Sequence, residues 1–284
     1  MDSLRIEELV KILSNERSTI KYLFEKKNST DTVHCPFCNY TKFYLMGRKR
    51  IRCRKCRKDH DFLKPTWFGR LRISYAKWLL LIKLFEVGTS ARMASSQAGI
   101  GYPAALKSYD TIRIAILHHI ARQNRILRGQ IEADEAYFGG RRKGNRGRGA
   151  KNKTIVFGIL ERGGKVSVSI VHNVSTDTLM GETVKKVRRG SVVYTDKWRG
   201  YDSLMFSGYR HLSIDHRYKF KSGKVYINGI EGFWSFAKER LIKHHGISPH
   251  KFLLYIKEME WRYNNRKNNL FDLLIDYMLG AVKL

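Results

Sequence analysis

Two Cys-x-x-Cys pairs constrain the fold of this 284-residue chain more than any other feature. The pairs are Cys35 with Cys38 and Cys53 with Cys56; fourteen residues separate them, and the chain has no other cysteine. Each pair can present two sulfurs from a tight turn, and four thiolates complete the tetrahedral coordination that zinc prefers. We therefore predict a zinc ribbon over residues 31–66. Its zinc should be structural, because four sulfurs leave no position for a substrate.

The charge of the chain indicates a polyanionic partner. Lys and Arg number 55 against 25 Asp and Glu, a formal net charge of +30 at pH 7. Residues 42–58 of the predicted ribbon hold nine of these cations and no acid, interleaved with Phe43 and Tyr44. Residues 141–153 hold seven more with three glycines, which is typical of a mobile loop that binds a polyanion. The commonest such partner is nucleic acid, and the ribbon becomes a candidate for binding it.

Helical periodicity dominates the first part of the chain outside the ribbon. Apolar spacing predicts a helical segment in residues 1–30 and three helices in a segment spanning 67–128. Gly88 ends the first of the three, Ser90 is placed to cap the second, and a glycine-containing turn precedes the third. This order predicts a helix-turn-helix domain. The start of its last helix, with Ala105, Lys107 and Ser108, would then turn toward DNA bases. A purely structural packing unit is the alternative.

From residue 129 onward the pattern changes to alternating polar and apolar residues. We predict one mixed α/β domain over residues 129–284, because three antiparallel strands are followed by alternating strands and helices. The predicted strands span residues 130–138, 154–161, 165–171, 191–196 and 210–214. The predicted helices span residues 176–188, 198–206, 228–244 and 249–264. Gly163 and Gly164 are expected to form the turn of the second hairpin.

Three acidic residues in this basic chain occupy positions that suggest chemistry. Asp134 lies inside the first predicted strand, Asp196 ends the fourth, and Glu231 lies on the helix that begins near Asn228. Two strand carboxylates and one helix carboxylate can converge on a pair of Mg²⁺ ions, which prefer oxygen ligands. Such a pair activates an attacking oxygen and stabilises the leaving oxygen at a phosphodiester. Lys238 shares a helical face with Glu231 and could hold a phosphate near the metals.

Three segments resemble the catalytic blocks of insertion-sequence DDE-type transposases. They are Glu132-Ala-Asp-Glu-Ala-Tyr-Phe-Gly-Gly140, Tyr194-Thr-Asp-Lys-Trp-Arg-Gly-Tyr201 and Asn228-Gly-Ile-Glu-Gly-Phe-Trp-Ser-Phe-Ala-Lys238. The group they resemble is the ISXO2-like one, which has an amino-terminal zinc ribbon and is related to the eukaryotic Merlin elements. The resemblance implies a zinc ribbon and a helical DNA-binding segment before an RNase H-like catalytic domain. It also implies that Asp134 and Asp196 are the first two catalytic acids.

The third catalytic position has two candidates on one helical face. Members of the resembled group often have Asn where other DDE enzymes have Glu, with a lysine following. The separation from Asp196 and the seven-residue step to Lys238 favour Glu231. Asn228 carries a neutral oxygen that binds Mg²⁺ more weakly than a carboxylate does. It stays a candidate, either as a co-ligand beside Glu231 or as the third catalytic residue itself.

We expect a DNA transposase that binds the terminal inverted repeats of its element, cleaves their phosphodiester bonds and joins the freed 3′-hydroxyl to target DNA. Structural Zn²⁺ and catalytic Mg²⁺, or Mn²⁺ in its place, are the expected cofactors. The expected partners are double-stranded DNA at the element ends and the target, and further copies of this chain that bring two ends together. The alternatives are an RNase H-like nuclease or resolvase that cuts without joining, and a DNA-binding regulator derived from an inactive transposase.

No segment is long and apolar enough to suggest a membrane span. The best apolar run, from Trp78 to Phe85, is short and interrupted by Lys83. The amino-terminal sequence, with Glu7 and Glu8, is unlike a signal peptide. We therefore expect no membrane partner. The expected location is the cytoplasm, associated with the nucleoid, in a prokaryote, or the nucleus in a eukaryote.

Overall fold

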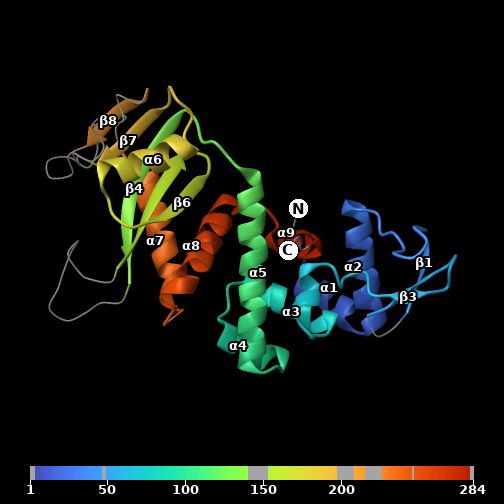
Figure 1. Ribbon diagram of the computed structural model, residues 1–284. Coiled ribbons are helices and arrows are strands. Elements are labelled where there is room, and N and C mark those ends of the chain that lie inside the picture. Colours follow the sequence, from blue (N-terminus) through green and yellow to red (C-terminus); the bar gives the residue numbers. More distant parts are fainter. Residues whose placement is uncertain are drawn as a thin grey trace. The chain divides into compact units, whose positions relative to one another are not determined.

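The chain folds into two compact units (Figure 1). The computed structural model describes residues 4–46, 49–139, 153–196, 208–214, 226–244 and 246–281. One unit, called the terminal unit here, consists of Met1–His119 and Asn265–Leu284. The other, called the central unit, consists of Ile120–Asn264. Residues 265–284, expected from the sequence to lie in the α/β domain over residues 129–284, belong instead to the terminal unit.

The terminal unit contains the ribbon strands and most of the helices. Its first elements are α1 (Ile6–Leu13), α2 (Glu16–Thr30), β1 (Phe43–Leu45), β2 (Ile51–Cys53), β3 (Asp59–His60) and the 3-10 helix η1 (Trp67–Arg70). They are followed by α3 (Tyr75–Glu86), α4 (Ala91–Ala98), α5 (Tyr102–Gln123) and, after the central unit, α9 (Leu270–Leu279). The last residues of α5 already belong to the central unit.

The ribbon is a three-stranded antiparallel sheet that packs on helix α2. The strand order is β1-β2-β3, and Phe43 of β1 pairs with Cys53 of β2. The ring of Phe24 in α2 meets the rings of Phe43 and Phe62 edge-on. The ring centroids are 5.9 Å and 5.5 Å apart, respectively. These aromatic contacts attach the ribbon to a helix that precedes it in the sequence.

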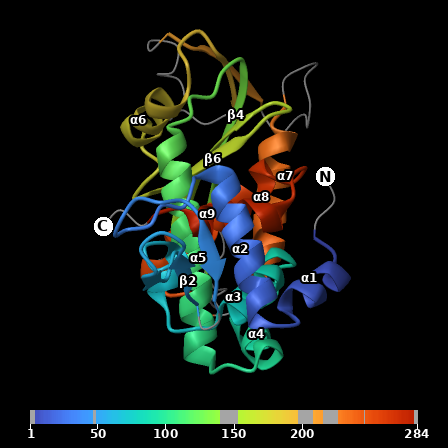
Figure 2. The same cartoon turned by 90° about the vertical axis from the view of Figure 1, so that its right-hand side faces the viewer.

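Helices α3, α4 and α5 form the predicted helical trio (Figure 2). The Ser90 side chain accepts a hydrogen bond from the backbone N–H of Met93, which confirms its predicted role as the cap of α4. Gly99 ends α4 in the left-handed conformation, with φ of 57°, which glycine adopts without strain. The trio closes around Trp78, Phe85 and Tyr109, all at most 1% exposed.

Helix α9 has no counterpart among the helices expected from the sequence, the last of which ends at residue 264. It packs against α2, α3 and η1 and buries one apolar face. The residues of that face are Phe271, Leu274, Ile275, Met278 and Leu279. An ion pair of 2.8 Å between Lys26 Nζ and Asp272 Oδ1 joins α9 to α2. The end of the chain therefore completes the core of the terminal unit.

The central unit is a five-stranded mixed sheet with helices on both faces. Its elements are β4 (Gln130–Phe138), β5 (Thr154–Glu161), β6 (Val166–Val171), α6 (Thr176–Lys186), β7 (Val192–Asp196), β8 (Arg210–Ile214), α7 (Asn228–Ile242) and α8 (Pro249–Asn264). The sheet order is β6-β5-β4-β7-β8, with β4, β5 and β6 antiparallel and with β7 and β8 parallel to β4. This is the predicted α/β fold with RNase H-like strand order.

Alternation along the strands divides their side chains between two apolar cores. One core joins the sheet to α7 and α8 and includes Phe138, Tyr194 and Trp234. The other includes Ile131, Val193 and Leu179 of α6. Residues 132 and 134 of β4 therefore face α7, and so does residue 196 of β7, because side chains two apart in a strand share a face.

Side chains of α8 cover the exposed edge of the sheet at β6. Asn264 accepts from the backbone N–H of Val166 and donates to its carbonyl, both at 2.8 Å. Glu260 accepts from the backbone N–H of Val168 at 3.0 Å. These bonds take the place of a sixth strand and protect the edge from pairing with another chain.

Two sequence predictions lie outside the described residues. These are the basic loop, except for Lys153 at its end, and the helix expected over residues 198–206. Within the described residues, no helix has the length and apolar character needed to cross a membrane.

Candidate active site and nucleic-acid interface

Asp134 and Asp196 lie beside each other on adjacent parallel strands. Strand β4 pairs with β7 as far as Glu132 and Tyr194, and the two aspartates each follow two residues later on their strands. They are close enough for the charge of Asp196 to act on the Asp134 carboxyl. Both side chains point to the face that α7 covers. The structure therefore brings together the two strand acids that the sequence marks as candidates.

The surroundings of Asp134 oppose its negative charge. Burial, followed by the negative charges of Glu135 and Asp196, raises the pKa of Asp134 to about 7. Glu135 is buried on the opposite face of β4. It raises the pKa of Asp134 as the next residue in the strand and is not itself part of the site. A divalent cation between Asp134 and Asp196 would offset this repulsion, and carboxylate oxygens are the ligands that Mg²⁺ and Mn²⁺ prefer. The pair of aspartates thus fits a hard metal ion.

Helix α7 presents the candidates for the third position on its exposed face. Asn228 begins the helix, and Asn228, Glu231 and Lys238 are all exposed. The opposite face, which includes Ile230 and Phe233, is buried against the sheet. In the part of the chain that the structure describes, the four cysteines are the one group of three or more Asp, Glu, His or Cys residues that could hold a metal ion. Glu231 therefore does not complete a three-carboxylate cluster here.

A buried carboxylate fixes the start of α7 against β4. Glu132, 1% exposed, accepts a hydrogen bond from the backbone N–H of Ile230 at 2.9 Å. A negative charge at this position favours the helix because the amino-terminal N–H groups carry a partial positive charge. Gly229 leaves the necessary space, since a Cβ atom there would lie 2.8 Å from Glu132 Oε2.

Arg162 neutralises Glu132 inside the fold. Its Nε donates to Glu132 Oε1 at 2.9 Å, and its guanidinium also donates to the carbonyl of Tyr226. The guanidinium lies over two aromatic rings. Its Cζ atom is 3.6 Å from the ring centroid of Tyr194 and 3.9 Å from that of Tyr226. Glu132 lies two residues before Asp134 and therefore shares its face of β4. No sequence pattern points to Arg162, thirty residues further along the chain.

Trp234 also contacts the site, and no motif in the sequence points to this contact. Phe233 and Trp234 are buried and pack α7 onto the sheet. In addition, Trp234 Nε1 donates a hydrogen bond to Asp134 Oδ2 at 3.0 Å. The only signal in the sequence was that Trp234 lies three residues after Glu231, on a helix already assigned to the site.

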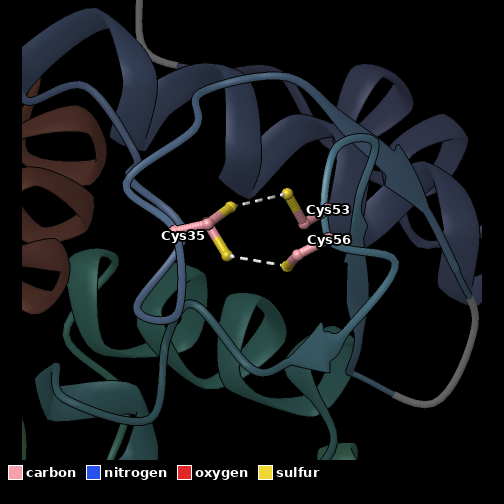
Figure 3. Close-up of side chains that lie close together, drawn as sticks. Cys35, Cys53 and Cys56 are labelled. Atoms are coloured by element: carbon pink, nitrogen blue, oxygen red, sulfur yellow. Dashed lines mark hydrogen bonds between the residues drawn. The ribbon is translucent and has the colours of Figure 1, made fainter.

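The four cysteines converge as the spacing predicts (Figure 3). Their sulfurs all lie within 4.8 Å of one another, and the pairs Cys35–Cys56 and Cys38–Cys53 are 3.6 Å apart. Four Zn–S bonds of 2.3 Å at tetrahedral angles require sulfurs about 3.8 Å apart, so the cluster fits one zinc ion.

The two turns that carry the cysteines have the same local structure. The backbone N–H of Asn39 donates to the carbonyl of Cys35, and that of Arg57 donates to the carbonyl of Cys53. Asn39 and Arg57 both adopt the left-handed conformation, with φ of 58° and 60°. Repetition of this turn brings two sulfurs from each side toward a common centre.

The ribbon surface combines exposed aromatic rings with cations. Phe37 is 54% exposed with Lys58 Nζ 4.8 Å from its ring centroid, and Tyr44 is 42% exposed with Arg54 at 4.7 Å and Arg57 at 5.5 Å. Beside it, α2 and the ribbon enclose a hollow of about 630 Å³. The lining of that hollow includes Arg17, Lys21, Tyr44 and Arg54. Such a surface can contact phosphates and stack on bases.

The prediction for the start of α5 is partly wrong. Ala105 and Ser108 are fully buried, so neither can reach a base, whereas Lys107 is exposed as expected. The buried face of α5 is the one that packs into the helical trio. Tyr102 is exposed at the start of α5, and the guanidinium of Arg92 from α4 lies 5.0 Å from its ring centroid.

Comparison with known proteins gives two sequence matches. Residues 126–264 match the family model described as an ISXO2-like transposase domain, and this range nearly coincides with the central unit. An uncharacterised transposase-like protein of Haemophilus influenzae is 46% identical over 101 residues, which is 36% of this chain and 82% of that protein.

Among solved structures, the chain has a weak likeness to complexes of the Mos1 transposase. The Mos1 mariner paired-end complex with Mn has a TM-score of 0.30 at 9% identity and covers 70% of this chain and 74% of that one. The Mos1 strand transfer complex has a TM-score of 0.27 at 9% identity, and the match covers 73% of this chain and 79% of that one.

Proposed function

Because the chain belongs to the ISXO2-like transposase family, we propose that it cleaves the ends of a DNA element and joins them to target DNA. The observation that carries this proposal is the juxtaposition of Asp134 and Asp196 on parallel strands under α7. Both reactions are displacements at phosphorus and can share one site.

The proposed roles follow from the positions of the side chains. Asp134 and Asp196 would hold Mg²⁺ or Mn²⁺, which would supply activation of the attacking oxygen and stabilisation of the leaving oxygen. Glu231 is the proposed third ligand, with Asn228 as the alternative. Lys238, exposed on the same helix, would orient a phosphate of the substrate.

Recognition of DNA is assigned to the terminal unit. We propose that Cys35, Cys38, Cys53 and Cys56 hold a structural zinc ion that shapes the ribbon. The cations beside Phe37 and Tyr44 would contact the backbone of the terminal repeats. Arg92, Tyr102 and Lys107 would form a second contact at the start of α5. A multimer of this chain would bring two element ends together.

A strand-transfer assay separates this function from its two rivals. The purified protein is given a pre-cleaved element end with a free 3′-hydroxyl, a supercoiled target plasmid and Mg²⁺. A transposase is expected to produce joined molecules. Cleavage of intact ends without joining would instead support a nuclease or resolvase. Binding to the ends without any metal-dependent cleavage would support a regulator.

The third metal ligand can be identified with two exposed substitutions on α7. We expect Glu231→Gln to lower strand joining by at least about 100-fold, as loss of a charged ligand would, and Asn228→Ala to lower it less. Neither side chain is buried, so the unfolding free energy should change by no more than about 0.5 kcal/mol. Joining rates under saturating DNA measure the effect.

Glu239→Gln is the matched control for that comparison. Glu239 lies on α7, its side chain is 80% exposed, and its substitution removes the same charge. It should leave joining unchanged. The reverse order, with Asn228→Ala inactive and Glu231→Gln active, would transfer the third position to Asn228.

A further inference from the structure

The indole of Trp234 connects helix α7 to the first catalytic aspartate. Its Nε1–H donates to Asp134 Oδ2 at 3.0 Å, and the side chain is nearly buried between the helix and the sheet. We propose that Trp234 is a positioning residue that fixes the Asp134 carboxylate in the orientation needed to bind the metal ion. Holding one oxygen determines the direction in which the other can receive a cation.

Strand β5 is built to admit this indole. Gly158 is the residue of β5 that pairs directly with Asp134. A Cβ atom at Gly158 would lie 2.6 Å from Cζ2 and 2.7 Å from Cη2 of Trp234, closer than such atoms can approach. The missing side chain at residue 158 therefore leaves the space beside Asp134 that the ring fills.

The contact also couples Asp134 to the remaining site residues. Trp234 lies on the same helix as Asn228 and Glu231, three residues after the latter. The bond from Ile230 to Glu132 joins the start of that helix to strand β4 two residues before Asp134. The two bonds join α7 to β4 at points about one helical turn apart, so the separation between the proposed ligands on the strand and on the helix is fixed.

Packing alone does not account for the direction of the indole N–H. A phenylalanine at residue 234 would fill much of the same space without an N–H group. A second buried tryptophan in the described structure shows that burial alone does not give an indole a hydrogen-bond partner. Trp78, fully buried in the terminal unit, has no hydrogen-bond partner for its Nε1. Trp234 instead directs its N–H at the carboxylate that the chemistry requires.

The test compares Mn²⁺ binding by variants of the full-length protein. Free Mn²⁺ is measured by electron paramagnetic resonance for the wild type, Trp234→Phe and Trp78→Phe, with the thermal unfolding midpoint recorded for each. Trp234→Phe should weaken Mn²⁺ binding at the active site by about 10- to 100-fold, the usual effect of losing a partner of a metal ligand. Trp78→Phe, the matched control, should bind Mn²⁺ like the wild type.

The inference rests on the proposed function of Asp134, and Asp134→Asn separates the two. If Asp134→Asn weakens Mn²⁺ binding and a folded Trp234→Phe does not, the positioning role is overturned and the metal site stands. If Asp134→Asn also binds Mn²⁺ normally, the proposed metal site itself fails.

A second measurement does not depend on the folding of a variant. In the ¹⁵N-labelled wild-type protein, addition of Mg²⁺ should shift the Nε1–H resonance of Trp234 and leave that of Trp78 in place. An unchanged Trp234 resonance at Mg²⁺ concentrations that support joining would overturn the proposal.

Discussion

Replacing either Asp134 or Asp196 by asparagine is expected to abolish both end cleavage and strand joining. Each change removes a negative charge from the pair that would hold the metal ion, and an amide oxygen is the weaker ligand. A loss of about 4 kcal/mol of transition-state stabilisation corresponds to a rate reduced about a thousandfold. Cleavage of labelled element ends and joining of pre-cleaved ends, both with Mg²⁺ present, measure the two activities.

Asp177→Asn is the control for these substitutions. Asp177 is an exposed acid on α6, the helix that packs on the opposite face of the sheet, so its loss changes the net charge without touching the site. It should cleave and join at the wild-type rate. Full activity of both Asp134→Asn and Asp196→Asn would contradict the proposed site.

Removing zinc from the ribbon is expected to abolish binding to the element ends. A structural zinc site contributes directly to folding, because the ligands do not converge without the metal. The described ribbon strands are short, two of three residues and one of two, so we expect their backbone pairing to be too weak to hold the sheet together without the metal. Chelation should release about one zinc ion per chain and increase amide hydrogen exchange in the strands β1 and β2. Cys53→Ser should have the same effect.

His34→Ala is the matched control for the cysteine substitution. His34 precedes Cys35 and is exposed, and it is not among the converging ligands. This variant should retain its zinc and bind the ends normally. Retention of end binding after complete loss of zinc would show that the metal has no role in shaping the DNA-binding surface.

Local patterns in the sequence were sufficient to predict most of the central unit. The strands at residues 130–138, 154–161 and 210–214 have their predicted bounds, and helix α8 has its predicted bounds as well. Alternation, turn glycines and helical spacing act within a few residues of each other, so each can be read directly from the chain. The two cysteine pairs are equally local, and their convergence is confirmed.

Contacts between distant segments could not be predicted in this way. Helix α9 has a clear apolar face, but nothing in its sequence shows that this face packs on α2 and α3 rather than on the sheet of the central unit. The same applies to α5, where the trio buries Ala105 and Ser108 and leaves Lys107 exposed. Which face of a helix is buried depends on partners that lie far away in the sequence.

The site itself was predicted as a set of acids but not as a set of contacts. Asp134 and Asp196 were chosen by their places at strands, and the parallel pairing of β4 and β7 explains why they meet. The bonds from Arg162 to Glu132 and from Trp234 to Asp134 join residues 30 and 100 positions apart. These bonds are visible only in the three-dimensional structure, because no sequence motif links the two partners of either bond.

The most direct test of the proposed catalytic site is the position of its metal ion. Crystals of the protein equilibrated with Mn²⁺, at a concentration that supports strand joining, would be measured for anomalous scattering at the manganese edge. A peak between the carboxylates of Asp134 and Asp196 is the predicted result. A manganese peak elsewhere in the central unit, with both aspartates free of metal, would contradict the assignment of this pair as the catalytic centre.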